Sequence, residues 1–167
     1  VQNIAFKGTI GNVWENTGVL GGSIKGAVLN CSVEISGSDA CGFAKKLSGG
    51  VIANSIAFGE SPSGALFAQY EDVNGAGLVK NCYWLDTLTM PSVPEGVLVN
   101  SMSREESEMK TLDLVELLNN GRGDSGSKWG QSSDGFPYFG ENQSYKPDTE
   151  VWPELPGESK YQVEFTS

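Results

Sequence analysis

An asparagine recurs at a nearly constant interval along the first half of the chain, and this repeat constrains the fold more than any other feature of the sequence. Each of these asparagines follows a β-branched residue by two positions and precedes a small or apolar residue. They are Asn3, Asn30, Asn54 and Asn81, so the intervals are 27, 24 and 27 residues. A period of this length, with glycine-rich variation between the markers, is typical of a solenoid.

The residues within each repeat favour strands over helices. Cys31, Val33 and Ile35 share one parity and alternate with polar side chains, which is the pattern of a half-buried strand. Glycine is too frequent between residues 8 and 77 for a series of helices. Turns of chain stacked about 4.8 Å apart would place equivalent residues in a column.

A column of asparagines has a structural reason to exist. Stacked carboxamides can hydrogen-bond from one turn to the next, and asparagine tolerates the left-handed backbone conformation that a tight turn needs. We therefore predict that the four marker asparagines form a structural ladder. A ligand-binding role for the same column is the alternative interpretation.

Parts of the repeat resemble a known motif. The segments that carry the resemblance are residues 18–21 (GVLG), 64–67 (GALF) and 79–85 (VKNCYWL), followed by a helix-like segment, Trp129-Gly130 and residues 134–138 (DGFPY). They resemble the GLUG-motif repeats of bacterial surface and secreted proteins. The likeness covers residues 1–140, although residues 41–44 (CGFA) depart from it. It implies a parallel β-helix-like module of a large exported protein, and it implies no catalytic residues.

One segment, from Ser103 to Asn119, has the pattern of an amphipathic helix. Ser103 and Glu106 have the spacing of a capping box. The apolar face consists of Met109, Leu112, Val115 and Leu118, widened by Leu114 and Leu117. We expect this helix to cover the exposed core at the end of the stack. A helix that binds a partner in a groove is the alternative.

The predicted fold is therefore all-β: a right-handed parallel β-helix, or β-solenoid, with one C-terminal capping α-helix. Residues 1–140 would form this unit. Residues 141–167 would be a linker or the start of a next module, because they are rich in Pro, Glu and Ser and end in a segment, 161–165, that alternates like a strand. Because the chain opens within a repeat, we expect it to be part of a longer multidomain protein.

Net charge and composition argue against binding to nucleic acid or to a membrane. The 167-residue chain carries a net charge of −10 and no histidine, so a basic surface for nucleic acid or anionic lipid is not expected. The sequence has no apolar stretch of the length that spans a membrane, so we expect no direct membrane insertion. From the resemblance we expect an extracellular or cell-surface location.

The sequence predicts no catalytic residues, no bound metal and no cofactor. Without histidine there is no Ser-His-Asp or Cys-His arrangement, and neither a phosphate-binding loop nor an aspartate-rich calcium loop is present. Cys31, Cys41 and Cys82 lack a metal-binding spacing. Cys31 and Cys82 fall two turns apart, roughly 10 Å, which is too far for a disulfide. We expect these thiols to be buried.

Two groups of residues are the candidates for ligand binding. Arg122, Gly123 and Asp124, followed by Ser125, spell a tetrapeptide that resembles the integrin-binding motif of matrix proteins; a polar turn after a helix is the alternative. Aromatic rings can also stack on sugars or fill the core. The candidates for a stacking platform are Tyr83, Trp84 and Trp129, together with Tyr138 and Phe139.

These observations favour a non-catalytic module of a bacterial cell-surface or secreted protein, acting as a rigid stalk or as an adhesion or ligand-binding surface. Its partner would be a host surface protein or a glycan. Two alternatives remain: a carbohydrate-binding fragment of a β-helix enzyme that acts on polysaccharides, and an accessory segment of a large surface protease. The lysines do not recur in register, which weighs against the first alternative.

Overall fold

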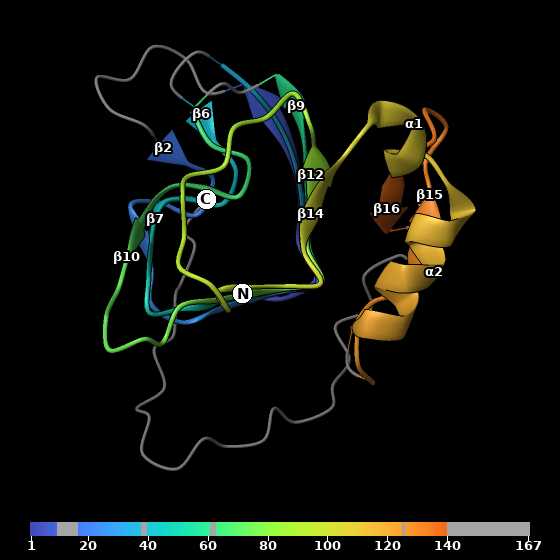
Figure 1. Ribbon diagram of the computed structural model, residues 1–167. Helices are drawn as coiled ribbons and strands as arrows, with labels where there is room; N and C mark the ends of the chain where they lie inside the picture. Colours follow the sequence, from blue (N-terminus) through green and yellow to red (C-terminus); the bar gives the residue numbers. More distant parts are fainter. Residues whose placement is uncertain (10–16, 38–39, 61–62, 125, 140–167) are drawn as a thin grey trace, which may run out of the picture.

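The computed structural model describes residues 1–9, 17–37, 40–60, 63–124 and 126–139 (Figure 1). The prediction of a mostly β fold is confirmed for these residues, and four of their five sheets, three of them with three or more strands, consist only of parallel strands. The predicted linker or next module over residues 141–167 lies outside the described residues.

Each parallel sheet takes one strand from successive turns of the chain. The first, called here the β5 sheet, contains in spatial order β1 (Ala5–Thr9), β5 (Ser32–Ser36), β9 (Ile56–Glu60), β12 (Tyr83–Leu85) and β14 (Met102–Arg104). The second, the β8 sheet, contains β4 (Ala27–Leu29), β8 (Val51–Ala53), β11 (Leu78–Lys80) and β13 (Leu98–Val99). The third, the β7 sheet, contains β3 (Ser23–Ile24), β7 (Ala44–Ser48) and β10 (Phe67–Glu71).

The remaining described elements are short. β2 (Thr17–Gly18) pairs in parallel with β6 (Ala40–Cys41), and β15 (Trp129–Gln131) pairs with β16 (Pro137–Phe139) as an antiparallel hairpin. The helices are α1 (Glu106–Met109) and α2 (Leu112–Gly121). Among the described residues, no helix has the length and apolar character needed to cross a membrane.

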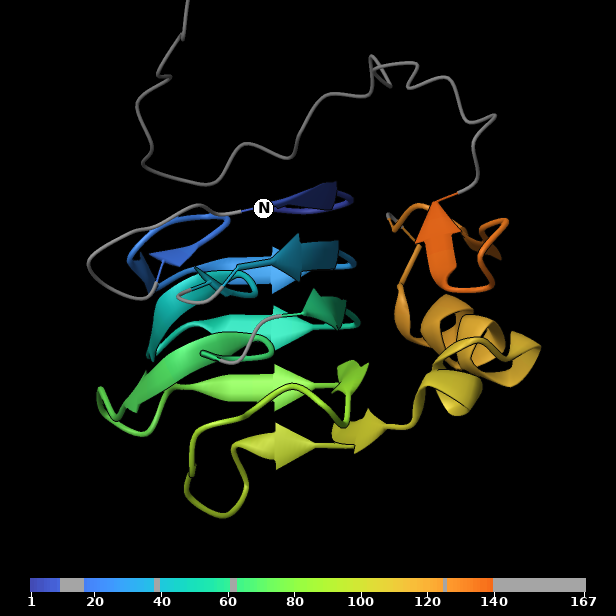
Figure 2. The ribbon, with the colours of Figure 1, turned by 90° about the horizontal axis from the view of Figure 1, so that it is seen from above.

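The register of the β8 and β5 sheets repeats the asparagine intervals. In the β8 sheet Val28 pairs with Ile52, and Ile52 pairs with Val79. These partners lie 24 and 27 residues apart along the chain. The following turn is shorter, because Val79 pairs with Leu98, only 19 residues further on. Each turn therefore lays its strands directly beside those of the turn before, as Figure 2 shows.

An asparagine forms the corner between the β8 sheet and the β5 sheet. β4 ends at Leu29 and β5 begins at Ser32, with Asn30 between them at a φ of 53°. The equivalent corners are Asn3, Asn54, Asn81 and Asn100, with φ values of 57°, 49°, 52° and 49°. Asparagine adopts this left-handed region more readily than other residues with a Cβ. Asn100 was not predicted from the sequence.

The three parallel sheets surround an interior (Figure 1), and rows of apolar side chains fill it. Val28, Ile52 and Val79 form one row in register, and at most 2% of each side chain is exposed. Burial of a side chain of this size contributes about 1.5–3 kcal/mol. Because the row is built from one residue per turn, adjacent turns stabilise each other through it.

The prediction of one helix that begins at Ser103 is wrong. Ser103 lies in β14, where it pairs with Trp84, so its backbone extends the β5 sheet. The helical segment starts after this strand, and its capping box is made by Glu105 and Glu108. Glu106, the predicted partner of Ser103, is the first residue of α1.

The helical segment is also interrupted and lies beside the stack of strands, not over its end (Figure 2). Thr111 separates the two helices and caps α2 by accepting a hydrogen bond from the backbone N–H of Leu114. This break changes the phase of the apolar face. Met109 and Leu118 are buried, whereas Leu112, predicted to share their face, is 70% exposed.

Candidate functional site

The corner asparagines are joined by hydrogen bonds between their carboxamides. Asn30 Nδ2 donates to Asn3 Oδ1 at 2.7 Å, and Asn54 Nδ2 donates to Asn30 Oδ1 at 2.8 Å. Asn81 has the same backbone conformation, which continues the column by one turn. The first three turns are therefore linked side chain to side chain, in addition to their backbone ladders.

Residues 105–139, called here the C-terminal arm, bind the outer side of this column. Asn30 Nδ2 donates to the Ser127 carbonyl at 3.0 Å, and Asn54 Nδ2 donates to the Leu118 carbonyl at 2.9 Å. The indole N–H of Trp129 donates to Asn30 Oδ1 at 2.5 Å. Asn30 and Asn54 are 1% and 3% exposed. The column is thus a docking surface for the arm, and the arm closes its members Asn30 and Asn54 to a ligand.

The arm leaves no free space beside the Asn54 side chain. Its Oδ1 atom is buried and has no hydrogen-bond partner among the described residues. A Cβ added to Gly121, in the last turn of α2, would lie 2.3 Å from this oxygen. Only glycine allows this approach, and the helix backbone fills the space in which a ligand of Asn54 would lie.

The aromatic platform predicted from the sequence is not available at three of its positions. Tyr83 and Trp84 are each 5% exposed and Trp129 is 2% exposed. Trp129, a residue of the arm, donates to Asn30 of the column, and the guanidinium of Arg104 lies 5.0 Å from the centre of the Tyr83 ring. These rings serve packing and hydrogen bonding, so the interpretation of them as a sugar-stacking surface was wrong.

The Arg-Gly-Asp segment lies at the end of α2. Arg122 donates from its guanidinium to the Gly126 carbonyl, four residues further along the same loop. Gly123, at a φ of 68°, and Asp124 are exposed, while Ser125 lies outside the described residues. The arginine is therefore engaged by its own turn, in agreement with the alternative that this segment is a polar turn.

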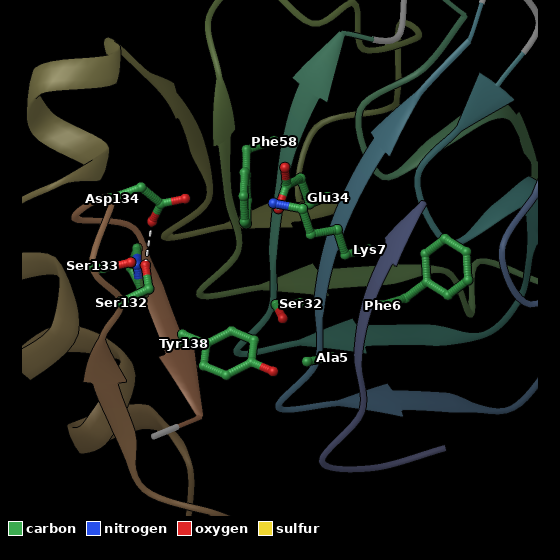
Figure 3. A pocket seen from close by; sticks show the side chains of 11 residues that line it. Ala5, Phe6, Lys7, Ser32, Glu34, Phe58, Ser132, Ser133, Asp134 and Tyr138 are labelled. Carbon is green, nitrogen blue, oxygen red and sulfur yellow. Dashed lines mark hydrogen bonds and ion pairs between the residues drawn. The ribbon is translucent and has the colours of Figure 1, made fainter. Parts of the chain in front are cut away.

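A cleft lies between the first turns of the β5 sheet and the β15–β16 hairpin (Figure 3). Its volume is about 270 Å³. One wall comes from β1, β5 and β9, and the other from the hairpin. The lining residues are Ala5, Phe6, Lys7, Ser32, Glu34 and Phe58 on the first wall and Ser132, Ser133, Asp134, Pro137 and Tyr138 on the second.

The charged groups of the cleft lie close to one another. Lys7 Nζ lies 2.8 Å from Glu34 Oε2. The hydrogen bond to Glu34 raises the pKa of Lys7, and the nearby carboxylate of Asp134 contributes in the same direction. Asp134 accepts hydrogen bonds from the Ser132 hydroxyl and the Phe136 N–H, and the first of these is the main cause of its lowered pKa. At neutral pH the cleft therefore holds one ammonium and two carboxylates.

The cleft forms where the outer face of the β5 sheet changes from apolar to charged side chains. The residues four positions after each corner asparagine are Lys7, Glu34, Phe58, Leu85 and Arg104. Lys7 pairs in register with Glu34, Glu34 with Phe58, and Leu85 with Arg104. Phe58 stacks on Phe136 of the arm, with ring centres 4.4 Å apart. The arm thus packs against this apolar member of the row and leaves a gap where the row becomes Lys7 and Glu34.

The cleft was not predicted from the sequence, although the repeat contains a signal for one of its two walls, the wall formed by the strands. Lys7 and Glu34 occupy the same position relative to their corner asparagines, so the repeat itself places them side by side. Ala5 and Ser32 are related in the same way. The second wall has no such signal, because the hairpin returns to the first turns only through the tertiary packing of the arm.

All three cysteines are free and buried. Loss of solvation raises the pKa of Cys82 to about 12 and that of Cys41 to about 11, and burial also raises the pKa of Cys31. The thiolate is the nucleophilic form of cysteine. These thiols are therefore protonated and unreactive near neutral pH, as expected for small core residues.

Comparisons with known proteins give no match for this chain among protein-family models, curated proteins or solved structures.

Substitution of Asn30 should separate its backbone role from its side-chain role. Asn30→Ala loses the carboxamide bonds and also the preference for positive φ, so we expect a loss of about 3–5 kcal/mol in the free energy of unfolding. Asn30→Gly restores the backbone freedom and loses only the bonds, so its loss should be smaller by about 1 kcal/mol. Urea-induced unfolding measures both values.

Asn74→Ala is the matched control for these variants. Asn74 also has a positive φ, 59°, but it is exposed in a loop. Its replacement should cost only about 1 kcal/mol of backbone strain. Equal losses for Asn74→Ala and Asn30→Ala would contradict a structural role for the Asn30 carboxamide.

The cysteines should resist a thiol reagent in the folded protein. At pH 8 a pKa of about 12 for Cys82 leaves roughly one thiol in ten thousand ionised, and burial blocks access as well. We expect negligible reaction with Ellman's reagent before unfolding and reaction of all three thiols in urea. Rapid reaction of one thiol in the folded protein would show that its burial is wrong.

Proposed function

We propose that this chain is a non-catalytic module of a bacterial cell-surface or secreted protein, which acts as a rigid spacer and presents a ligand-binding cleft. The fold we propose for it is a right-handed parallel β-helix. Support comes from the three parallel sheets, two of which, the β5 and β8 sheets, repeat the asparagine intervals, and from the asparagine at the same corner of each turn. The resemblance of its repeats to the GLUG motif supports the exported setting.

The observation that carries the spacer role is the way the arm binds several turns at once. Asn3 Oδ1 accepts a hydrogen bond from the backbone N–H of Ser127 at 2.9 Å. The same arm binds Asn30 through Trp129 and Asn54 through the Leu118 carbonyl. A unit built only of stacked turns can separate between any two turns. Here the arm bridges three of them, so separation of any one pair also breaks contacts with the arm.

The chemistry of the cleft supports a binding role over a catalytic one. A general acid of a glycosidase needs a carboxyl group whose pKa is raised. The pKa of Asp134 is lowered instead, because its carboxylate accepts hydrogen bonds. The carboxylate of Glu34 is paired with Lys7. Both groups are therefore suited to hydrogen bonding with a ligand, and this observation favours carbohydrate binding as the second candidate function.

Stretching of single molecules by their ends tests the spacer role. Because the arm couples the turns, we expect one main rupture, which releases the contour length of the chain from residue 1 to residue 139, roughly 46–50 nm, less the initial end-to-end distance. Asn30→Ala should lower the rupture force, whereas Asn74→Ala should leave it unchanged. A series of small steps at low force, one for each turn, would contradict a rigid spacer.

A further inference from the structure

We propose that the cleft between the β5 sheet and the β15–β16 hairpin binds one neutral sugar ring, with Tyr138 as the stacking surface and Lys7, Glu34 and Asp134 as its hydrogen-bonding groups. This inference rests on the proposed function, because it names the ligand class of the same module. Tyr138 is one of the five aromatic residues that the sequence offered as a stacking platform, and it is exposed, whereas Tyr83, Trp84 and Trp129 are buried.

Tyr138 is the aromatic side chain that the cleft presents to a ligand. Its side chain is 39% exposed, and Figure 3 shows its ring lying opposite Ala5 and Ser32 across the cleft. On the opposite wall, Phe58 is only 6% exposed because it stacks on Phe136, and Figure 3 shows the ring of Phe6 pointing away from Tyr138. A flat, partly exposed ring with a polar tip suits a ligand that has both C–H faces and hydroxyl groups.

The polar groups around this ring include both donors and acceptors. The ammonium of Lys7 supplies donors, and the carboxylates of Glu34 and Asp134 supply acceptors, each with lone pairs beyond those used within the protein. The hydroxyl of Ser32 can act in either sense. Neighbouring hydroxyl groups of a sugar donate and accept at once, so they match such a mixed set better than a ligand with one kind of polar group.

The balance of charge argues against ionic ligands. Two carboxylates face one ammonium, and the chain carries a net charge of −10, so a phosphate or sulfate would be repelled. A cationic ligand would have to displace Lys7 from its contact with Glu34. An apolar ligand would bury these charges without replacing their hydrogen bonds to water, which is costly. A neutral polyhydroxyl compound avoids all three costs.

The size of the cleft limits the ligand to a short one. Its volume of about 270 Å³ lies near the lower end of small-molecule pockets, roughly 300 Å³. This is room for a single ring, and not for a long segment of a polysaccharide. Such a site recognises one sugar unit at a time, and the expected dissociation constant is in the millimolar range, about 1 mM.

The test is an NMR titration of the whole chain with neutral methyl glycosides of glucose, galactose, mannose and N-acetylglucosamine. We expect at least one of them to show saturation transfer and to shift the amide signals of the two cleft walls, at Lys7, Glu34 and Ser132–Asp134. Sodium phosphate and methylammonium at the same concentration should produce no such shifts. Saturable shifts of the cleft signals by either ion, with none by the glycosides, would overturn the proposal.

Substitutions of cleft residues test whether the sugar binds in the cleft. Tyr138→Ala should weaken binding about tenfold through loss of stacking, while Tyr138→Phe, which keeps the ring, should bind nearly as well as the parent. Glu34→Gln should also weaken binding. Glu95→Gln is its matched control, because Glu95 is exposed and lies outside the cleft, and it should have no effect. Circular dichroism shows whether each variant is folded.

The outcomes distinguish this inference from the proposed function. If no glycoside binds at about 10 mM, or if binding is insensitive to both Tyr138→Ala and Glu34→Gln in folded variants, the sugar site is refuted. The spacer role would still stand on a single rupture under force. Stepwise rupture together with retained sugar binding would instead refute the spacer role and leave the sugar site in place.

Discussion

The structure depends on the corner asparagines, each of which turns the backbone and, through its carboxamide, can hydrogen-bond to neighbouring parts of the chain. Each corner between the β8 and β5 sheets needs a positive φ, which glycine provides without a side chain and which alanine resists. Asparagine provides the φ and also a carboxamide that can donate two hydrogen bonds and accept two. At Asn30 and Asn54 one N–H bonds to the preceding turn and the other to the arm. The same side chain therefore fixes the turn, the stacking and the position of the arm.

The arm explains why the outer face of the β5 sheet is apolar in one part and charged in another. Phe58, Tyr83 and Leu85 would be exposed apolar residues on a bare sheet, and they are buried in the folded chain. α1 contacts β12 and β14, and Phe136 of the hairpin region stacks on Phe58. Beyond this apolar area the face carries Lys7 and Glu34, where the hairpin and the sheet enclose a cleft. The order of charged and apolar side chains across the strands therefore determines both where the arm packs and where the candidate binding site lies.

Much of the β architecture could be predicted from the sequence, because the asparagine intervals are local and regular. Asn100 was missed because its turn is only 19 residues long and a leucine replaces the β-branched residue before it. The arm was misplaced because amphipathicity predicts that a helix buries one face, and says nothing about the surface that it covers. The paired positions of Lys7 and Glu34 were encoded in the repeat, whereas the approach of Asp134 and Tyr138 depends on tertiary packing that local patterns do not contain.

The most direct measurement is hydrogen exchange of the asparagine side-chain amides, followed by NMR after transfer of the folded protein into D2O. Both protons of the Asn30 and Asn54 carboxamides are donated within the protein, so we expect them to exchange more slowly than those of exposed Asn74 by about two orders of magnitude or more. Exchange of all three side chains at similar rates would contradict a column that joins the turns and holds the arm.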